Sequence, residues 1–270
     1  MHKYDLIKLA DKYAASRNLA PLHRITFVSR ARMLERTRPK DAPPAQRVNR
    51  LLASYAASHA PSTVKGLRGD LLTLWRYVAS LGLCEPPVPG EVWRPKVPAT
   101  LPECYSLEEV RELVAGCPHL RGRYGKIARG LYWDALIRAA WDTGLRKGDL
   151  MHVSAGDLRE GHVLVTVAHK TGARVIHTLA PATVAALIVV GKLAFPAPDW
   201  SFTRHFHKLR DLTVGHGQFK WLRRSSGSYV ALEHGDAAGA AHLGHTSVAT
   251  FRKYYDARLI GDSRPAPPVL

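Results

Sequence analysis

His242-Leu243-Gly244-His245-Thr246-Ser247-Val248-Ala249-Thr250-Phe251-Arg252-Lys253-Tyr254 is the stretch of this sequence that carries the most information about the fold. It places a histidine directly after a glycine, and a tyrosine nine residues after that histidine. Two upstream segments each carry an arginine, and Lys170 lies between them in the chain. These segments read Thr143-Gly144-Leu145-Arg146-Lys147-Gly148-Asp149-Leu150 and Lys220-Trp221-Leu222-Arg223-Arg224.

Two arginines, a lysine, a histidine and a tyrosine are together the groups needed to break a phosphodiester without a metal ion. Cations neutralise the non-bridging oxygens, an acid protonates the leaving oxygen, and a hydroxyl attacks phosphorus. Each residue alone has a simpler explanation. Arg146 and Asp149 also fit an ordinary surface ion pair three residues apart, and Lys170 fits an exposed turn. The combination, rather than any one residue, indicates this chemistry.

In this order and spacing the segments resemble those of the tyrosine recombinases, the family of phage integrases and Xer-type recombinases. The resemblance covers nearly the whole chain. It implies a mainly α protein with a small antiparallel β-sheet, built from a helical core-binding domain and a mixed α/β catalytic domain. It also implies a site-specific DNA recombinase that cleaves and rejoins strands through a 3′-phosphotyrosyl intermediate.

The resemblance assigns a role to each residue of the set. Arg146 and Arg223 are expected to clamp the scissile phosphate. Lys170, at a turn between two predicted strands, is expected to protonate the departing 5′ oxygen. His245 is expected to donate a hydrogen bond to a non-bridging oxygen or to contact the nucleophile. Tyr254 is the expected nucleophile, although Tyr255 beside it carries the same phenol.

Lys220 departs from the family's pattern, which usually has histidine three residues before the second arginine. A lysine at this position still carries positive charge and donates hydrogen bonds. Lysine is ordinarily protonated at neutral pH, so it does not suit the role of general base. We therefore expect Lys220 to contribute to the catalytic set by its charge.

The charge of the chain indicates a polyanionic partner. The 270 residues carry 39 Lys and Arg against 22 Asp and Glu, a net charge of +17. Residues 1–103 carry 17 basic and 8 acidic residues and residues 104–270 carry 22 and 14, so both halves are positive, by nine and by eight. Because the excess is shared by both halves, we expect double-stranded DNA to contact both.

Three cysteines without a CxxC pair are typical of reduced thiols, and no apolar stretch approaches the length of a membrane span. We therefore expect a cytoplasmic, nucleoid-associated protein from a prokaryotic or phage context, with no contact to a membrane. His234, His242 and His245 are close in sequence, but no cysteine or carboxylate joins them at ligand spacing. Neither a metal nor a cofactor is expected.

The first hundred residues have helical periodicity, with predicted breaks at 18–21 and 38–44. Pro61-Ser62-Thr63 is a predicted N-cap before a long amphipathic helix. Lys65 and Arg68 lie off its apolar face and are predicted to contact DNA phosphates, with a solvated helix face as the plain alternative. The apolar face consists of Val64, Leu67, Leu71, Leu74, Trp75, Val78 and Leu81.

These patterns predict a core-binding domain over residues 1–84, a proline-rich linker over 85–103 and a catalytic domain over 104–270. The catalytic domain is predicted to open with a capped helix at Ser106-Leu107-Glu108-Glu109. It then continues with a helix over Tyr124–Asp142 and strands over 162–168 and 174–180.

Two other functions remain open at this stage. One is a DNA-relaxing or end-resolving enzyme, of the type IB topoisomerase or resolvase kind, that uses the same cleavage without strand exchange. The other is a non-catalytic, sequence-specific DNA-binding protein of the same fold. For assembly, the resemblance implies a homotetramer on two DNA sites and a monomer when the protein is free in solution.

Overall fold

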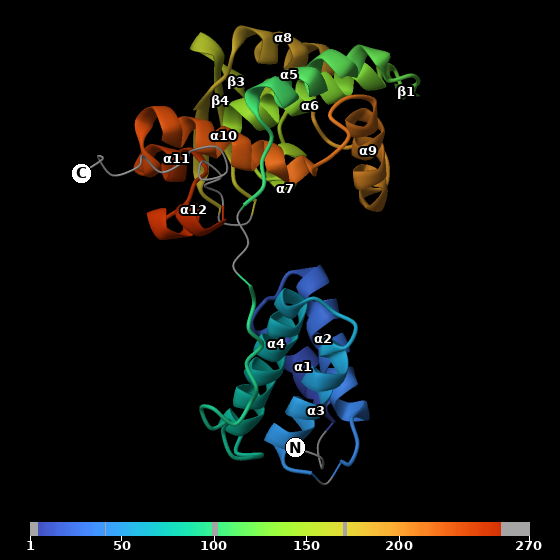
Figure 1. Ribbon diagram of the computed structural model, residues 1–270, viewed down its shortest axis with the longest axis vertical. Coiled ribbons are helices and arrows are strands. Elements are labelled where there is room, and N and C mark those ends of the chain that lie inside the picture. Colours follow the sequence, from blue (N-terminus) through green and yellow to red (C-terminus); the bar gives the residue numbers. More distant parts are fainter. Residues whose placement is uncertain (1–4, 41, 99–101, 170–171, 255–270) are drawn as a thin grey trace, which may run out of the picture. The chain divides into compact units, whose positions relative to one another are not determined.

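The computed structural model of the chain describes residues 5–40, 42–98, 102–169 and 172–254, and of Tyr254 the backbone only. The chain divides into two compact units, Met1–Ala99 and Thr100–Leu270. Helices dominate both, with small antiparallel sheets in the second unit, so the predicted fold class is confirmed (Figure 1).

The N-terminal unit is a bundle of helices around an apolar core. Its last helix is α4 (Pro61–Ser80), and of the seven apolar positions predicted for this helix all but Leu81 are buried. Pro61 is the first residue of that helix, where its missing N–H costs no intrahelical bond, and the N-cap is Ala60 rather than the predicted Ser62 or Thr63. The helices are α1 (Leu6–Ser16), α2 (Pro21–Arg36), α3 (Pro44–Ala56) and α4 (Pro61–Ser80).

Much of the predicted linker packs on this bundle. Val92 is buried in the helical core. The indole of Trp75 donates a hydrogen bond to the carbonyl of Glu85 at 2.7 Å. Arg68 donates from Nε to the carbonyl of Trp93 at 2.9 Å and from Nη2 to that of Val92 at 3.2 Å. Prolines stop a helix here, but extended backbone still finds side-chain donors, so the first unit reaches residue 99 rather than 84.

The second unit is organised around α6, which packs on α8 on one side and on α10 on the other (Figure 1). Its helices are α5 (Leu107–Gly116), α6 (Arg129–Thr143), α7 (Lys147–Leu150), α8 (Pro181–Val190), α9 (Phe202–Leu212), α10 (Phe219–His234), α11 (Asp236–His242) and α12 (Val248–Tyr254), with short 3-10 turns η1 (Cys117–His119), η2 (Ala155–Asp157), η3 (Glu160–His162) and η4 (Asp199–Ser201). The capping box predicted for α5 is present: Ser106 and Glu109 each accept the other's backbone N–H.

The two predicted strands pair with each other in a three-stranded antiparallel sheet. β4 (Val163–Val167) pairs with β5 (Arg174–Thr178), with Val165 opposite Ile176. A short strand that the sequence analysis missed, β3 (Leu158–Arg159), pairs with the other edge of β4. The connection between β4 and β5 carries Lys170, which lies outside the described residues.

The predicted helix over Tyr124–Asp142 begins later than expected. Residues Arg123–Tyr124 (β1) and Ile127–Ala128 (β2) form a small hairpin, and α6 starts at Arg129. Gly125, in the turn of the hairpin, has a positive φ of 57°, which favours glycine and interrupts a helix. In the described part of the chain, no helix is both long and apolar enough to cross a bilayer.

Arg68 and Lys65 should contribute differently to stability, because Arg68 donates hydrogen bonds to two backbone carbonyls. Arg68→Ala should lower the free energy of unfolding by about 1–3 kcal/mol, because it leaves two carbonyls without a charged donor. Lys65 is exposed, and Lys65→Ala should change stability by less than about 0.5 kcal/mol. Urea denaturation of both variants checks this, and equal midpoints would contradict it.

Candidate active site

Arg146 projects from a sharp turn between α6 and α7. Gly144 ends α6 in the left-handed conformation, with φ 56° and ψ 17°. A Cβ at this position would lie 2.5 Å from Leu243 Cδ2 and 3.0 Å from His242 Nε2, so both its conformation and its neighbours require glycine. The turn ends at Arg146, the N-cap of α7, whose side chain stays 38% exposed.

Arg223 lies beneath Arg146 and is almost fully buried, at 6% exposure. Its guanidinium donates to the carbonyl of Gly144 and, from Nη2, to the carbonyl of Leu243 at 2.7 Å. The same Nη2 also lies 3.1 Å from Nε2 of His245. A buried charge is tolerated only when it is well hydrogen-bonded, and these acceptors meet that requirement. Arg223 therefore connects α10 to the turn before Arg146 and to the segment before His245.

His245 is a neutral imidazole in this arrangement. A guanidinium can only donate, so Nε2 of His245 accepts and the ring proton sits on Nδ1. Burial, which is the largest cause, and the charges of Arg223 and Arg146 together lower the pKa of His245 to about 4. At neutral pH the ring therefore adds hydrogen-bonding capacity to the site without adding charge.

Two half-buried histidines that the sequence analysis did not assign, His177 and His242, lie close to Arg223. His242 and His177 pack edge to face with ring centroids 5.3 Å apart. Burial is the main cause that lowers the pKa of each to about 4. Ser226 donates to the carbonyl of Trp141 at 2.5 Å, so its Oγ accepts from Nε2 of His242 at 2.7 Å. In the sequence, the one indication that His242 belongs to this site is its position three residues before His245.

The last described helix, α12, is held by its apolar side. Phe251 is fully buried against Ala231, Ala240 and Leu243. An ion pair between Arg252 and Asp236 joins α12 to α11. Thr250, on another side of α12, lines a cavity in front of the arginines. The backbone of Tyr254 ends this helix, and its side chain lies outside the described residues, as does Tyr255.

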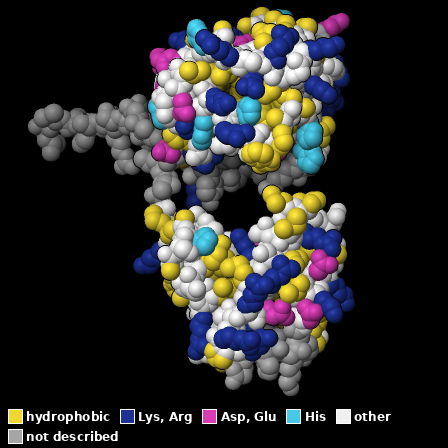
Figure 2. Space-filling view, turned by 90° about the vertical axis from the view of Figure 1, so that its right-hand side faces the viewer, with side chains coloured by type: hydrophobic (Ala, Val, Ile, Leu, Met, Phe, Trp, Pro, Cys, Tyr) yellow, Lys and Arg dark blue, Asp and Glu magenta, His cyan; other side chains and the backbone are white. Residues whose placement is uncertain are grey.

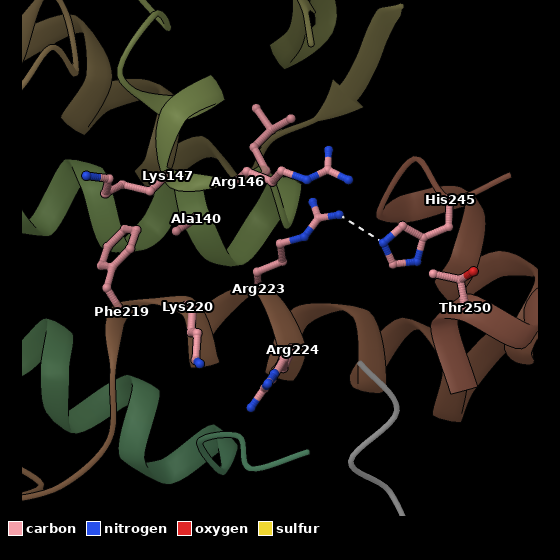
Figure 3. A pocket seen from close by; sticks show the side chains of 10 residues that line it. Ala140, Arg146, Lys147, Phe219, Lys220, Arg223, Arg224, His245 and Thr250 are labelled. Carbon is pink, nitrogen blue, oxygen red and sulfur yellow. Dashed lines mark hydrogen bonds between the residues drawn. The ribbon is translucent and has the colours of Figure 1, made fainter. Parts of the chain in front are cut away.

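The cavity has a volume of about 430 Å³ and collects most of the predicted catalytic set: Arg146, Lys220, Arg223 and His245, with Thr250 at one side. Figure 3 shows the guanidinium groups of Arg146 and Arg223 side by side and directed toward His245. Lys220 and Arg224 extend from α10 on the other side, away from the two guanidinium groups. The structure thus brings Arg146, Arg223 and His245 into one cluster and places Lys220 at the margin.

Other charges beside the cavity are already engaged. Lys147 lies 2.5 Å from Asp199 and 4.9 Å from the centre of the Phe202 ring. Arg224 donates to the carbonyl of Glu103 at 3.1 Å. Arg146 is less tightly held, since its ion pair with Asp149 spans 3.8 Å. Arg146 is therefore the more available cation for an anionic ligand.

Asp149 links Arg146 to the sheet. Its carboxylate is buried, and Oδ1 accepts the backbone N–H of His169 at 2.9 Å. His169 directly precedes Lys170, so one carboxylate contacts both the first arginine and the start of the loop that carries the predicted acid. Among the described residues, no three histidine, cysteine, aspartate or glutamate side chains form a group that could hold a metal ion.

Neither a family model nor any curated protein matches the chain at a significant level. Solved structures do match. A lambda integrase tetramer bound to a Holliday junction is 18% identical with a TM-score of 0.74, covering 97% of this chain and 79% of that one. XerH site-specific recombinase bound to a difH substrate is 14% identical with a TM-score of 0.68, covering 95% and 83%.

A third match, the Tn1549 transposon integrase in complex with transposon right end DNA, is 14% identical with a TM-score of 0.67, covering 95% of this chain and 98% of that one. All three are tyrosine recombinases. The resemblance predicted from the sequence is therefore confirmed at the level of the fold, which is the tyrosine recombinase fold.

The lowered pKa values of the half-buried His177, His242 and His245 predict a stability that depends on pH. Each has a folded pKa near 4, below the ordinary value of 6.5. As the pH falls, the unfolded chain binds protons first, so stability declines between pH 6.5 and 4, by at most about 1.4 kcal/mol per pH unit for each histidine. His177→Leu should reduce this slope, and the exposed His234→Gln is the matched control. Chemical denaturation at pH 7 and pH 5 gives the slopes; an unchanged slope in His177→Leu would contradict the prediction.

Proposed function

We propose that this protein is a site-specific DNA recombinase of the tyrosine class. The observation that carries the proposal is the convergence of Arg146, Arg223 and His245 on one cavity beside α12. These residues come from three distant segments of the chain. Because a structural ion pair would not require this convergence, the cluster favours a role in binding one tetrahedral anion.

In the proposed reaction the scissile phosphate enters the cavity and contacts Arg146 and Arg223. Arg223 is held in place by backbone carbonyls, so it needs little reorganisation as negative charge develops at phosphorus. Arg146, which is partly exposed, supplies the more adaptable contact. Lys220 contributes long-range charge from the margin of the cavity, consistent with lysine in place of the usual histidine.

Tyr254 is the proposed nucleophile. Its Cα follows Thr250 by one helical turn, so the two positions share a face of α12, and Thr250 lines the cavity. The phenol oxygen of Tyr254 forms a bond to phosphorus while the bond from phosphorus to the 5′ oxygen breaks. The phenol gives its proton to solvent and the 5′ oxygen gains one from the acid, which leaves a 3′-phosphotyrosyl link and a free 5′ hydroxyl.

Lys170 is the proposed acid for the departing 5′ oxygen. It follows His169, whose backbone is fixed by the same carboxylate that pairs with Arg146. A flexible ammonium group at the end of a loop suits delivery of one proton. The reaction conserves the energy of the phosphodiester in the protein link, so it needs neither a metal ion nor a nucleotide cofactor.

Duplex DNA is the proposed partner, since the matched structures are bound to a Holliday junction, a difH substrate and transposon right end DNA. In this proposal a monomer binds one core site and a homotetramer assembles on two. Lys65 is a proposed phosphate contact of the N-terminal unit. Arg68 already donates two of its five N–H groups to carbonyls, so the three on Nη1 and Nη2 that remain are the ones proposed to contact a phosphate. The proposed setting is the nucleoid.

The non-catalytic alternative would retain DNA binding without an adduct. The relaxing or resolving alternative would form the adduct and rejoin only the original strands. Sequencing of products from two marked duplexes separates strand exchange from simple resealing.

Tyr254 and its neighbour Tyr255 give the most direct test of the nucleophile. Tyr254→Phe should abolish the covalent adduct on a nicked suicide duplex while DNA affinity stays nearly unchanged, because only one hydroxyl is lost. Tyr255→Phe, the matched control, should still form the adduct. Peptide mass mapping of the adduct checks the assignment, which an adduct on Tyr255 would overturn.

Lys170→Ala should slow cleavage by about 10²–10⁴-fold if Lys170 is the acid. A duplex with sulfur at the 5′ bridging position has a leaving group that hardly needs a proton. That substrate should restore the rate of Lys170→Ala and should not restore Arg146→Ala. Single-turnover rates on both substrates provide the measurement, and equal defects on both would remove the acid role from Lys170.

A further inference from the structure

A second hollow of about 640 Å³ lies in the same unit and shares no lining residue with the cavity around Arg223. It is bounded by η1, the β1–β2 hairpin, the start of α6 and the second half of α9. Nothing in the proposed strand cleavage uses it. Its lining combines cations and hydrogen-bond donors with an aromatic wall, and the best-defined members are Arg121, Tyr124, Arg129, Trp133, His205 and Lys208.

Arg129 packs closely against its neighbours in this hollow. Its guanidinium carbon lies 5.2 Å from the centre of the Tyr124 ring. A Cβ at Gly122 would lie 3.3 Å from both Cζ and Nε of Arg129, and Gly122 has a φ of 95°. The guanidinium therefore lies close to both an aromatic ring and a glycine backbone. Its Nε is buried and has no hydrogen-bond partner among the described residues.

His205 is oriented as a donor by its neighbours. The indole of Trp133 donates to the Tyr124 hydroxyl at 3.4 Å, and that hydroxyl lies 2.7 Å from Nδ1 of His205. Since the hydroxyl proton has no other acceptor in the described part of the chain, it is donated to Nδ1. Nε2 then carries the ring proton. Burial and the nearby charges of Arg129 and Lys208 lower the pKa of His205, so the ring is a neutral N–H donor.

The positive charge of the hollow is not balanced by its own carboxylate. Asp211 is the acidic residue in its lining, and Arg210 binds it at 2.7 Å. No ion pair of Arg121, Arg129 or Lys208 occurs among the described residues. The 15-residue helix α6 begins at Arg129, and the positive end of its dipole adds to the charge of the hollow. Figure 2 views the side that carries β1 and α9, where many Lys, Arg and His side chains lie among few acidic ones.

We infer that this hollow is a second anion site, which binds a phosphate group. Arg129 and Lys208 supply charge, His205 supplies a neutral N–H, and phosphate offers enough oxygens to accept from all three. The phosphate can come from the backbone of a DNA duplex or from a small phosphate-bearing molecule. Both sources present the same phosphate group to the site. They differ in whether occupation of the site requires a DNA duplex.

The position of α9 favours DNA as the source of the phosphate. Thr203 and His207, on one side of this helix, border a further hollow together with Lys147 and Lys220 of the proposed active site. His205 and Lys208, on another side, line the anion site. A duplex lying across α9 would contact both. Only this DNA source rests on the proposed function; binding of a free phosphate does not.

The first experiment uses inorganic phosphate as the probe and the full chain as the protein. Calorimetric titration should give two sites per chain, one at Arg146 and Arg223 and one at the second hollow. Arg146→Ala should remove the first. Lys208→Ala and His205→Gln, both outside the apolar core, should weaken the second by about tenfold. Lys192→Ala, an exposed cation outside both linings, is the matched control.

The second experiment measures duplex affinity over a range of salt concentrations. If the phosphate belongs to DNA, Lys208→Ala should reduce the slope of log affinity against log salt by about 0.9, and Lys192→Ala should leave it unchanged. Loss of the second phosphate site supports the anion site; a reduced slope then identifies DNA as the source, and an unchanged slope identifies a small phosphate-bearing molecule. Parent-like behaviour of Lys208→Ala and His205→Gln in both experiments would overturn it. The Tyr254 adduct, assayed on the same variants, reports separately on the proposed function.

Discussion

The buried guanidinium of Arg223 is the interaction on which the arrangement of the second unit's site depends. One side chain on α10 donates to the carbonyl of Gly144 and to that of Leu243, and contacts His245. A guanidinium at 6% exposure would be strongly destabilising without these acceptors. The same contacts fix the turn before Arg146 and the segment that leads to α12. Charge for the site and its geometry are therefore supplied by one residue.

The three imidazoles around Arg223 are neutral, which suits this role. His177, His242 and His245 all have pKa values near 4, so none adds positive charge beside the guanidinium at neutral pH. His242 also contacts Ser226 and lies against Gly144. Polar but uncharged neighbours hold the arginine while its charge remains available to an anion in the cavity. The arrangement has a cost at low pH, where protonation of these rings opposes the folded state.

The resemblance of three sequence segments to motifs of the tyrosine recombinases was enough to predict that Arg146, Arg223 and His245 lie together. The strands β4 and β5 were also predictable from their β-branched residues. The late start of α6 was not, since a two-residue hairpin leaves little periodic signal. The setting of His177 depends on its contact with His242, which is distant in sequence. The backbone contacts of Arg68 likewise were not predicted, because its carbonyl partners lie 24 and 25 residues away; the sequence analysis assigned this side chain to DNA phosphates.

The central claim is that Arg223 acts through its fixed hydrogen bonds and not through charge alone. Arg223→Lys keeps the charge but cannot reach several acceptors at once. The decisive measurement is the single-turnover rate of DNA cleavage by this variant, on protein shown to be folded and to bind DNA with parent affinity. We predict a loss of about 10²–10³-fold, the effect of removing one preorganised donor. A rate equal to that of the parent would contradict the account.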